Sequence, residues 1–125
     1  GKNNMSDIDK INSCVQSYYD GCCESDSNKI KDVFDENAMI SGYLPDGLHE
    51  MSLNDFADFV GAQQPSPRSK GDEESLEIIS SDIHGSTAIV MVREKYLGMT
   101  FVDTLSFLKK DDTWKIYTKL FHVES

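Results

Sequence analysis

The sequence predicts an α+β fold in which helices come first and an antiparallel sheet follows, with the helices on one face of the sheet. In the first half of the chain, apolar residues recur at three- and four-residue spacing, which is typical of helices with one buried face. From residue 75 onward, segments rich in apolar and β-branched residues alternate with turn residues, which is typical of consecutive strands. The chain has 125 residues, so we expect one domain covering residues 1–125.

Each expected helix has an apolar face and a residue able to cap its first turn. The apolar face of the first helix consists of Ile8, Ile11, Val15, Tyr18, Tyr19 and Cys22. Ser25 or Asp26 can cap a second helix, which ends near Asn37. Its shared face consists of Ile30, Val33 and Phe34. Ser52 and Asp55 resemble a capping box that opens a third helix. The residues that this helix is expected to bury are Leu53, Phe56, Phe59 and Val60.

The expected strands are separated by residues that favour turns. Residues 38 to 44 form a first short strand before the turn at Pro45, Asp46 and Gly47. Four later strands, divided near Gly85, Gly98 and Asp111, have the sequences SLEIISSDI, STAIVMVREKYL, MTFVDTLSFLKK and TWKIYTKLFHV. Because consecutive strands are usually neighbours in space, these four predict an antiparallel meander.

The polar segment of residues 62 to 73 predicts a surface loop, because it contains Pro65, Pro67 and Gly71 and lacks an apolar period. We expect this loop to be mobile and to border a pocket as a lid. Arg68 and Lys70 are the clustered cations of an acidic chain, so we expect them to face an anionic ligand.

The charge and composition exclude some classes of partner. The chain has 12 Lys and Arg residues against 22 Asp and Glu residues, a net charge of −10, which would repel a nucleic acid backbone. No apolar run approaches the roughly 20 residues of a membrane span, so we expect no membrane partner. We expect a cytoplasmic protein, although a chain beginning at Gly1 leaves a trimmed leader open.

Cys14, Cys22 and Cys23 are odd in number and lack the spacing of a zinc site. We therefore expect free thiols on a helix face, with no metal and no cofactor. The chain has no glycine-rich phosphate loop and no recognisable nucleophile elbow, so redox and phosphoryl chemistry are not indicated.

Asp103 is an acid inside an apolar strand, and strand alternation indicates which way it points. In the last expected strand, Trp114, Ile116, Thr118, Leu120 and His122 share one face, while Lys115, Tyr117 and Lys119 share the other. Lysines belong toward water, so the face of His122 is expected to be the inner one. In the preceding strand the apolar face, made of Phe101, Asp103, Leu105 and Phe107, is the better core candidate. Asp103 is therefore expected to point inward.

The expected register brings Asp103 and His122 together. A turn from Lys110 to Thr113 would set Asp103 opposite Leu120 and make it a diagonal neighbour of His122, about 7 Å away at the backbone. We expect these two side chains to be electrostatically coupled. A turn near Gly98 would set Glu94 opposite Asp103, and a slip of one residue would reverse the face of Glu94.

Several stretches resemble one known family. They are YYDGCCESDSNKIKDVFDENAMISG, MSLNDFADFV, DIHGSTAIVMV and above all FVDTLSFLKKDDTWKIYTKLFH. Together they resemble the family described as "putative lumazine-binding", within the nuclear transport factor 2-like superfamily, over nearly the whole chain. The resemblance implies a cone-shaped α+β fold, in which a curved, mainly antiparallel sheet wraps around three helices and leaves a pocket at its open end.

The resemblance also marks individual positions. The best matches to the family pattern are Asp103, Trp114, Lys119, Phe121 and His122. One departure is the turn at Asp111, Asp112 and Thr113, where an Asn-Gly or Gly-Lys type would be expected. The superfamily includes ketosteroid isomerase, scytalone dehydratase and SnoaL-like polyketide cyclases, as well as binding and scaffold proteins. Fold alone therefore does not decide function.

The candidate site combines an acid and a histidine with an aromatic lining. The candidate catalytic residues are Asp103 and His122. The candidate ligand-binding residues are Tyr18, Phe34, Phe56, Phe59, Glu94, Tyr96, Phe101, Trp114 and Thr118. A buried acid is costly unless it is paired or protonated, so Asp103 is either poised for proton transfer or satisfied by hydrogen bonds that hold the fold together. His122 has the alternative of being a solvated residue near the chain end, and His49 and His84 are expected to be exposed.

Three functions are compatible with these residues. The first is a protein that binds a compact aromatic or heterocyclic small molecule in the cone. The second is a cofactor-independent isomerase, dehydratase or cyclase with Asp103 as general base and His122 or Tyr96 as hydrogen-bond donor. The third is a dimeric scaffold with a filled cone. A water-accessible cavity of about 300 Å³ or more would favour the first two.

We also expect a homodimer formed across the outer face of the sheet. The residues expected on that face are Val102, Thr104, Leu108, Tyr117 and Phe121. Few charges accompany them, and an exposed apolar patch of this kind is a liability on a monomer.

Overall fold

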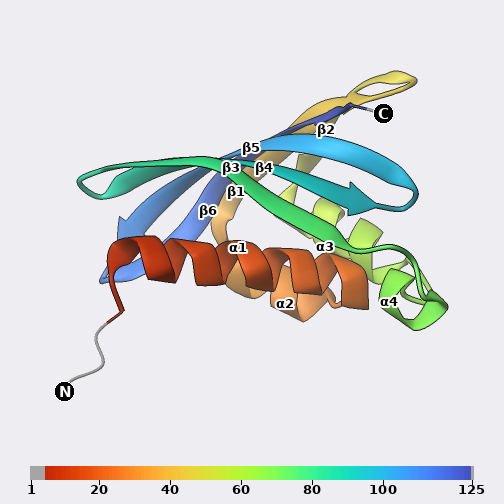
Figure 1. Ribbon diagram of the computed structural model, residues 1–125, viewed down its shortest axis with the longest axis horizontal. Helices are drawn as coiled ribbons and strands as arrows, with labels where there is room; N and C mark the ends of the chain where they lie inside the picture. The colour runs from red at the N-terminus through yellow and green to blue at the C-terminus, as the bar shows by residue number, and fades with distance from the viewer. Residues whose placement is uncertain (1–4, 125) are drawn as a thin grey trace.

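The structure is a computed structural model that describes residues 5–124, so Gly1 lies outside the described residues. Its helices are α1 (Asp7–Glu24), α2 (Ser27–Val33), α3 (Leu53–Gly61) and the short α4 (Pro67–Lys70). Its strands are β1 (Phe34–Leu44), β2 (Gly47–Ser52), β3 (Ser75–His84), β4 (Thr87–Tyr96), β5 (Met99–Lys110) and β6 (Thr113–Val123). The helices lie against one face of the sheet (Figure 1), which confirms the predicted α+β arrangement.

The helices begin at side-chain caps. Ser6 accepts a hydrogen bond from the backbone N–H of Asp9 at the start of α1, and Asp26 does the same for Lys29 in α2. Ser52 accepts from the N–H of Asp55 in α3, at 3.1 Å. Of the two caps considered for the second helix, Asp26 is the one used, because Ser25 adopts the left-handed conformation that ends α1.

The second helix is shorter than expected. It ends at Val33 instead of near Asn37, because Phe34 already has extended backbone angles and pairs with Ile116 of β6. Strand β1 therefore starts four residues earlier than the expected first strand at residue 38. The side chain of Phe34 remains in the core, where its ring contacts Tyr18 and Phe56 edge-on.

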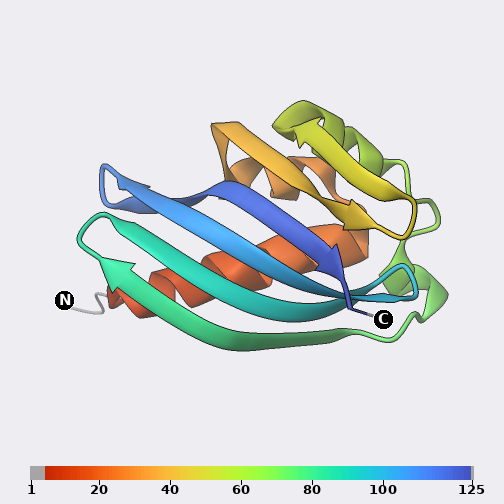
Figure 2. The ribbon, with the colours of Figure 1, turned by 90° about the horizontal axis from the view of Figure 1, so that it is seen from above.

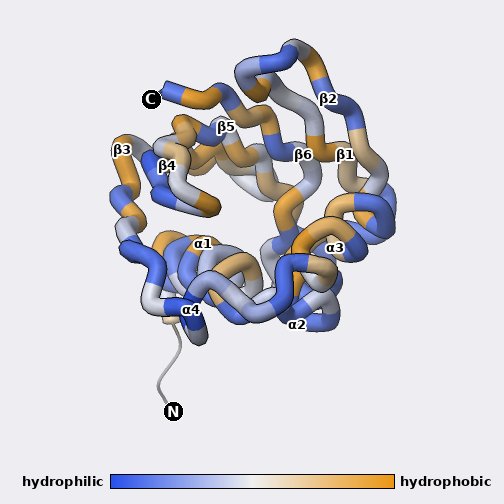
Figure 3. Tube along the Cα trace, turned by 90° about the vertical axis from the view of Figure 1, so that its right-hand side faces the viewer, coloured by the Kyte–Doolittle hydropathy of each residue, from blue (hydrophilic) through white to orange (hydrophobic). Residues whose placement is uncertain are grey.

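The six strands form one sheet in the order β2-β1-β6-β5-β4-β3. The four strands from β3 to β6 form the predicted antiparallel meander, and β1 joins β6 in parallel, which makes the sheet mixed. Seen from above, the sheet is a single twisted surface with α1 beneath it (Figure 2). Seen from the end, the strands arch over α1, α2 and α3 (Figure 3), and the apolar core fills the space between them.

A β-bulge in β6 changes which residues point inward. Lys109 pairs with Trp114 as expected, and Phe107 pairs with Ile116, but Ser106 then pairs with Thr118, so Tyr117 is skipped. A one-residue shift in a strand exchanges its two faces. Beyond the bulge, Asp103 consequently lies opposite Phe121 instead of Leu120.

The expected orientations beyond the bulge are therefore wrong. Lys119 and Phe121 point inward, each with 6% of its surface exposed, whereas Leu120 is 56% exposed. His122 is exposed on the outer face, where its ring lies 6.0 Å from that of Tyr43. Thr118 is also on the outer side, in hydrogen-bond contact with Ser106.

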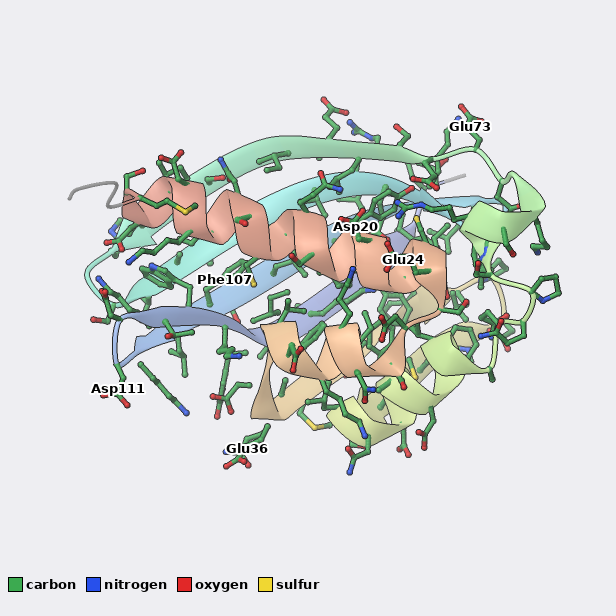
Figure 4. The ribbon with its side chains drawn as sticks, turned by 90° about the horizontal axis from the view of Figure 1, so that it is seen from below. Asp20, Glu24, Glu36, Glu73, Phe107 and Asp111 are labelled. Atoms are coloured by element: carbon green, nitrogen blue, oxygen red, sulfur yellow. The ribbon has the colours of Figure 1, made fainter. Side chains whose placement is uncertain are left out.

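The loop from residue 62 to residue 73 is anchored instead of forming the expected lid. It contains α4, and the guanidinium of Arg68 donates to Asp20 and Glu24 of α1 and to Glu74, at 3.0, 2.7 and 2.9 Å. Figure 4 shows Asp20 and Glu24 near the end of α1 that faces α4. Arg68 is therefore already paired with three carboxylates of the protein, and the prediction that it faces an anionic ligand is wrong.

A substitution at Gly42 of β1 tests how closely β1 packs against β6. A Cβ at this position would lie 2.1 Å from the carbonyl oxygen of Phe121 and 2.4 Å from its ring. We predict that Gly42→Ala lowers the free energy of unfolding by about 2 to 3 kcal/mol, measured by urea denaturation, because neither atom can move without disturbing the sheet.

Gly61→Ala is the matched control. A Cβ at Gly61, the last residue of α3, would make an ordinary contact of 3.4 Å with Ser27. Alanine there favours the helix, so we expect no loss of stability. Equal urea midpoints for the two variants would contradict the close approach of β1 and β6.

Candidate functional site

Four polar side chains from four elements meet in the apolar interior. They are Tyr18 of α1, Glu94 of β4, Asp103 of β5 and Lys119 of β6, each at most 6% exposed. The hydroxyl of Tyr18 donates to Glu94 Oε2 at 2.9 Å and lies 3.4 Å from Asp103 Oδ2. Lys119 Nζ in turn donates to Tyr18 Oη at 2.5 Å. We call these residues the buried polar cluster.

Strand alternation explains how the two acids come together. Glu94 pairs with Phe101, two residues from Asp103, so the acids are diagonal neighbours on the inner face of the sheet. The expected pairing of Glu94 directly with Asp103 is wrong by two residues. A shift of two keeps the same face, and both acids therefore point inward as predicted.

The cluster changes the protonation of its members. Burial, followed by the negative charge of Asp103 and a hydrogen bond with it, raises the pKa of Glu94 well above its ordinary value. Burial and then the charges of Asp103 and Glu94 also raise the pKa of Tyr18. The raised pKa favours the protonated form of Glu94, and a protonated carboxyl can donate a hydrogen bond. Asp103 lacks a donor at one oxygen, because its Oδ1 has no hydrogen-bond partner within residues 5–124.

Lys119 keeps its charge inside the protein. Burial acts to lower its pKa, but the charges of Asp103 and Glu94 act in the opposite direction and raise the pKa above its ordinary value. The ammonium nitrogen also lies 4.8, 4.6 and 5.5 Å from the ring centres of Tyr18, Phe56 and Phe121. These cation–π contacts partly replace the water that the ammonium has lost.

A cavity of about 170 Å³ lies next to the buried polar cluster. Its apolar wall includes Leu44, Met51, Phe56, Phe59, Phe101 and Phe121. Its polar lining includes Glu94, Lys119, Tyr96 and His49. Phe59 is 43% exposed, so the expectation that α3 buries it is wrong, and it lies where the cavity meets solvent. No residue from 62 to 73 lines this cavity, although Asp72 and Glu73 line a separate open pocket of about 470 Å³, so the segment is not a lid over the candidate site.

The structure brings together most of the predicted site residues. Phe56, Phe59, Glu94, Tyr96 and Phe101 line the cavity. Tyr18 contacts Glu94, and Phe34 packs between the rings of Tyr18 and Phe56, so both support the cavity wall from behind. Asp103 belongs to the buried polar cluster but does not line the cavity.

Three predicted site residues lie elsewhere. Trp114 is buried near the start of α1, where its indole N–H donates to Asp7 at 3.1 Å. Thr118 and His122 are on the outer side of the sheet because of the bulge. His122 is therefore not a neighbour of Asp103 inside the fold, and the expected electrostatic coupling of the two inside the cone is wrong.

Sequence patterns missed Lys119, Phe121 and His49 as cavity residues. The alternation of residues along the strand assigned Lys119 to the outer face, because the pattern of apolar residues does not reveal the bulge. The signal that did favour Lys119 and Phe121 was their match to the family pattern. His49 is half-buried at the cavity, and its ring contacts Asp46 at 2.7 Å. The sequence shows only that His49 follows a turn, so it did not indicate a place in the cavity lining.

The fold and the site define a nuclear transport factor 2-like cone with an internal cavity. The profile of the family described as "Putative lumazine-binding" matches residues 6–122, and the chain belongs to this family. No curated protein matches the sequence. Within residues 5–124, no helix is both long and apolar enough to span a membrane.

Solved structures show the same fold. A protein of unknown function from Silicibacter pomeroyi is 21% identical, with a TM-score of 0.84, and 94% of this chain and 95% of that chain are covered. Another, from Methylobacillus flagellatus, is 25% identical, with a TM-score of 0.84 and coverage of 99% and 97%. A domain with a cystatin-like fold from Nostoc punctiforme is 16% identical, with a TM-score of 0.76 and coverage of 98% and 80%.

The raised pKa of Glu94 predicts a pH-dependent stability. The folded state holds a proton on Glu94 that the unfolded chain releases above its ordinary pKa of 4.5. The contribution is therefore complete below pH 4.5 and is lost as the pH rises toward the folded pKa, by at most about 1.4 kcal/mol per pH unit.

Glu94→Gln isolates this contribution, because an amide imitates the neutral acid and does not titrate. We expect the wild type to lose more stability than Glu94→Gln between pH 5 and pH 8 in urea denaturation. Parallel pH profiles for the two proteins would show that Glu94 is ionised in the folded state.

Proposed function

We propose that this protein binds a compact aromatic or heterocyclic small molecule in the 170 Å³ cavity. The observation that carries this proposal is the cavity itself, which has aromatic and aliphatic walls and polar groups from Glu94 and Lys119 at its lining. An apolar cavity of about 150 Å³ in another protein is sufficient to bind benzene. The volume therefore suits a ligand built on a single ring. The family description, which refers to a heterocycle, supports the same class of ligand.

The other two functions have less support. At about 170 Å³ the cavity is smaller than the about 300 Å³ that was expected to favour a binding protein or an enzyme, but it is not filled as a pure scaffold would require. Asp103 lies behind Glu94 and does not line the cavity, so the geometry offers no direct route from a ligand to this acid as a general base. A cofactor-independent enzyme remains the second candidate only if the chemistry uses Glu94.

Filling the cavity tests the binding proposal. Leu44 lines the cavity, and we expect Leu44→Trp to abolish binding of single-ring compounds that raise the melting temperature of the wild type. Ile79→Trp is the control, since Ile79 of β3 is 41% exposed and does not line the cavity. The proposal fails if no single-ring compound stabilises the wild type, or if Leu44→Trp and the wild type bind equally well.

We also propose that the outer face of the sheet forms a homodimer. The supporting observation is a shallow groove of about 310 Å³ lined by Tyr43, Leu48, Val102, Leu120 and His122, among others. Tyr43, Leu48 and Leu120 are each more than half exposed. Leu120 thus takes the place expected for Phe121, which points inward. Large exposed apolar side chains in one groove are typical of an interface.

A charge in this groove should disrupt the dimer. We expect the wild type to have a dimeric mass in light scattering at micromolar concentration, and Leu120→Lys to have a monomeric mass, since an unpaired buried ammonium is costly. Ile8→Lys, on α1 and away from this face, should remain dimeric. A monomeric wild type would refute the interface.

A further inference from the structure

The ammonium of Lys119 has hydrogen-bonding capacity that the protein does not use. An ammonium carries three N–H donors, and the oxygen partner of Lys119 is Tyr18 Oη. Its other close neighbours are the ring faces of Phe56 and Phe121, which also line the cavity. The side chain is 94% buried, so bulk water reaches it poorly. A donor in this position is suited to an acceptor atom on a molecule that occupies the cavity.

The charges around the cavity are already balanced. Burial beside Asp103 favours the protonated form of Glu94, and the positive charge of Lys119 is opposed by the negative charge of Asp103 behind it. His49, the remaining titratable imidazole in the lining, contacts the carboxylate of Asp46. An anionic ligand would place a second negative charge near Asp103 in a poorly hydrated space, and a cationic ligand would lie against Lys119. The cavity lining therefore offers no unpaired opposite charge to either an anionic or a cationic ligand.

We propose that the ligand is an uncharged single-ring molecule that presents a hydrogen-bond acceptor, such as an amide or lactam carbonyl or a ring nitrogen, to the ammonium of Lys119. This inference rests on the proposed binding function and specifies the ligand class for the same cavity. The cavity volume limits the ligand to a single ring, and the unused N–H donors of Lys119 require a hydrogen-bond acceptor on it. The opposite charges of Lys119 and Asp103 favour an uncharged ligand.

Four probes of similar size separate these requirements. Benzamide is neutral and carries a carbonyl acceptor, while benzoate and benzamidinium have nearly the same shape with a negative or a positive charge. Toluene has the ring without an acceptor. We expect the wild type to bind benzamide at least about 10-fold more tightly than each of the other three in isothermal titration calorimetry, because hydrogen bonds to charged groups contribute strongly to binding.

A double variant assigns the preference to Lys119. Lys119→Met keeps the length of the side chain but leaves Asp103 buried without its counter-ion, which can prevent folding. Asp103→Asn combined with Lys119→Met removes both charges together. In this protein we expect benzamide to bind about 10-fold more weakly than in the wild type, whereas toluene should bind within about 3-fold of its wild-type affinity.

The outcomes distinguish the two proposals. If none of the four probes binds, toluene included, the binding function and the ligand class both fail. If toluene binds but benzoate or benzamidinium equals or exceeds benzamide, the cavity is a binding site and the inferred neutrality is wrong. If benzamide keeps its full affinity in the double variant, Lys119 is not the donor and the inferred contact is wrong.

Discussion

The position of the Lys119 ammonium is the constraint on which the rest of the interior depends. The skipped residue Tyr117 turns Lys119 and Phe121 inward and Leu120 and His122 outward. Without this bulge, Glu94 and Asp103 would face each other in the core with no cation beside them. The bulge thus decides both the charge balance of the buried polar cluster and the composition of the cavity wall.

The buried polar cluster shows how a protein can keep charge in an apolar interior. The Lys119 ammonium lacks water, but it donates a hydrogen bond to Tyr18, lies over three aromatic rings and is stabilised by the charge of Asp103. Removing one member of a buried ion pair typically costs about 3 to 5 kcal/mol, because the other charge remains uncompensated. The raised pKa of Glu94 lowers the negative charge that the cluster has to accommodate beside Asp103. A cluster with such a strict charge balance also restricts the charge of any ligand beside it.

Much of the fold followed from local patterns, whereas the site depended on one irregularity. The apolar face of α1 apart from Ile8, which is 37% exposed, the caps Asp26 and Ser52 and the meander were predictable because each depends on nearby residues. The inward direction of Asp103 followed from the apolar residues beside it. The bulge at Tyr117 was not predictable, since its cause lies in how β6 fits between β1 and β5. Because the bulge shifts the register by one residue, the expected site contained His122 where the structure has Lys119.

Cross-strand nuclear Overhauser effects between β5 and β6 test this account most directly. The structure predicts that backbone protons of Asp103 show cross-strand contacts that place it opposite Phe121, and those of Leu105 contacts that place it opposite Lys119. Lys115, before the bulge, should remain opposite Leu108. Contacts that place Asp103 opposite Leu120, and Leu105 opposite Thr118, would mean that the strand has no bulge. Lys119 would then face solvent, and the account of the site would be wrong.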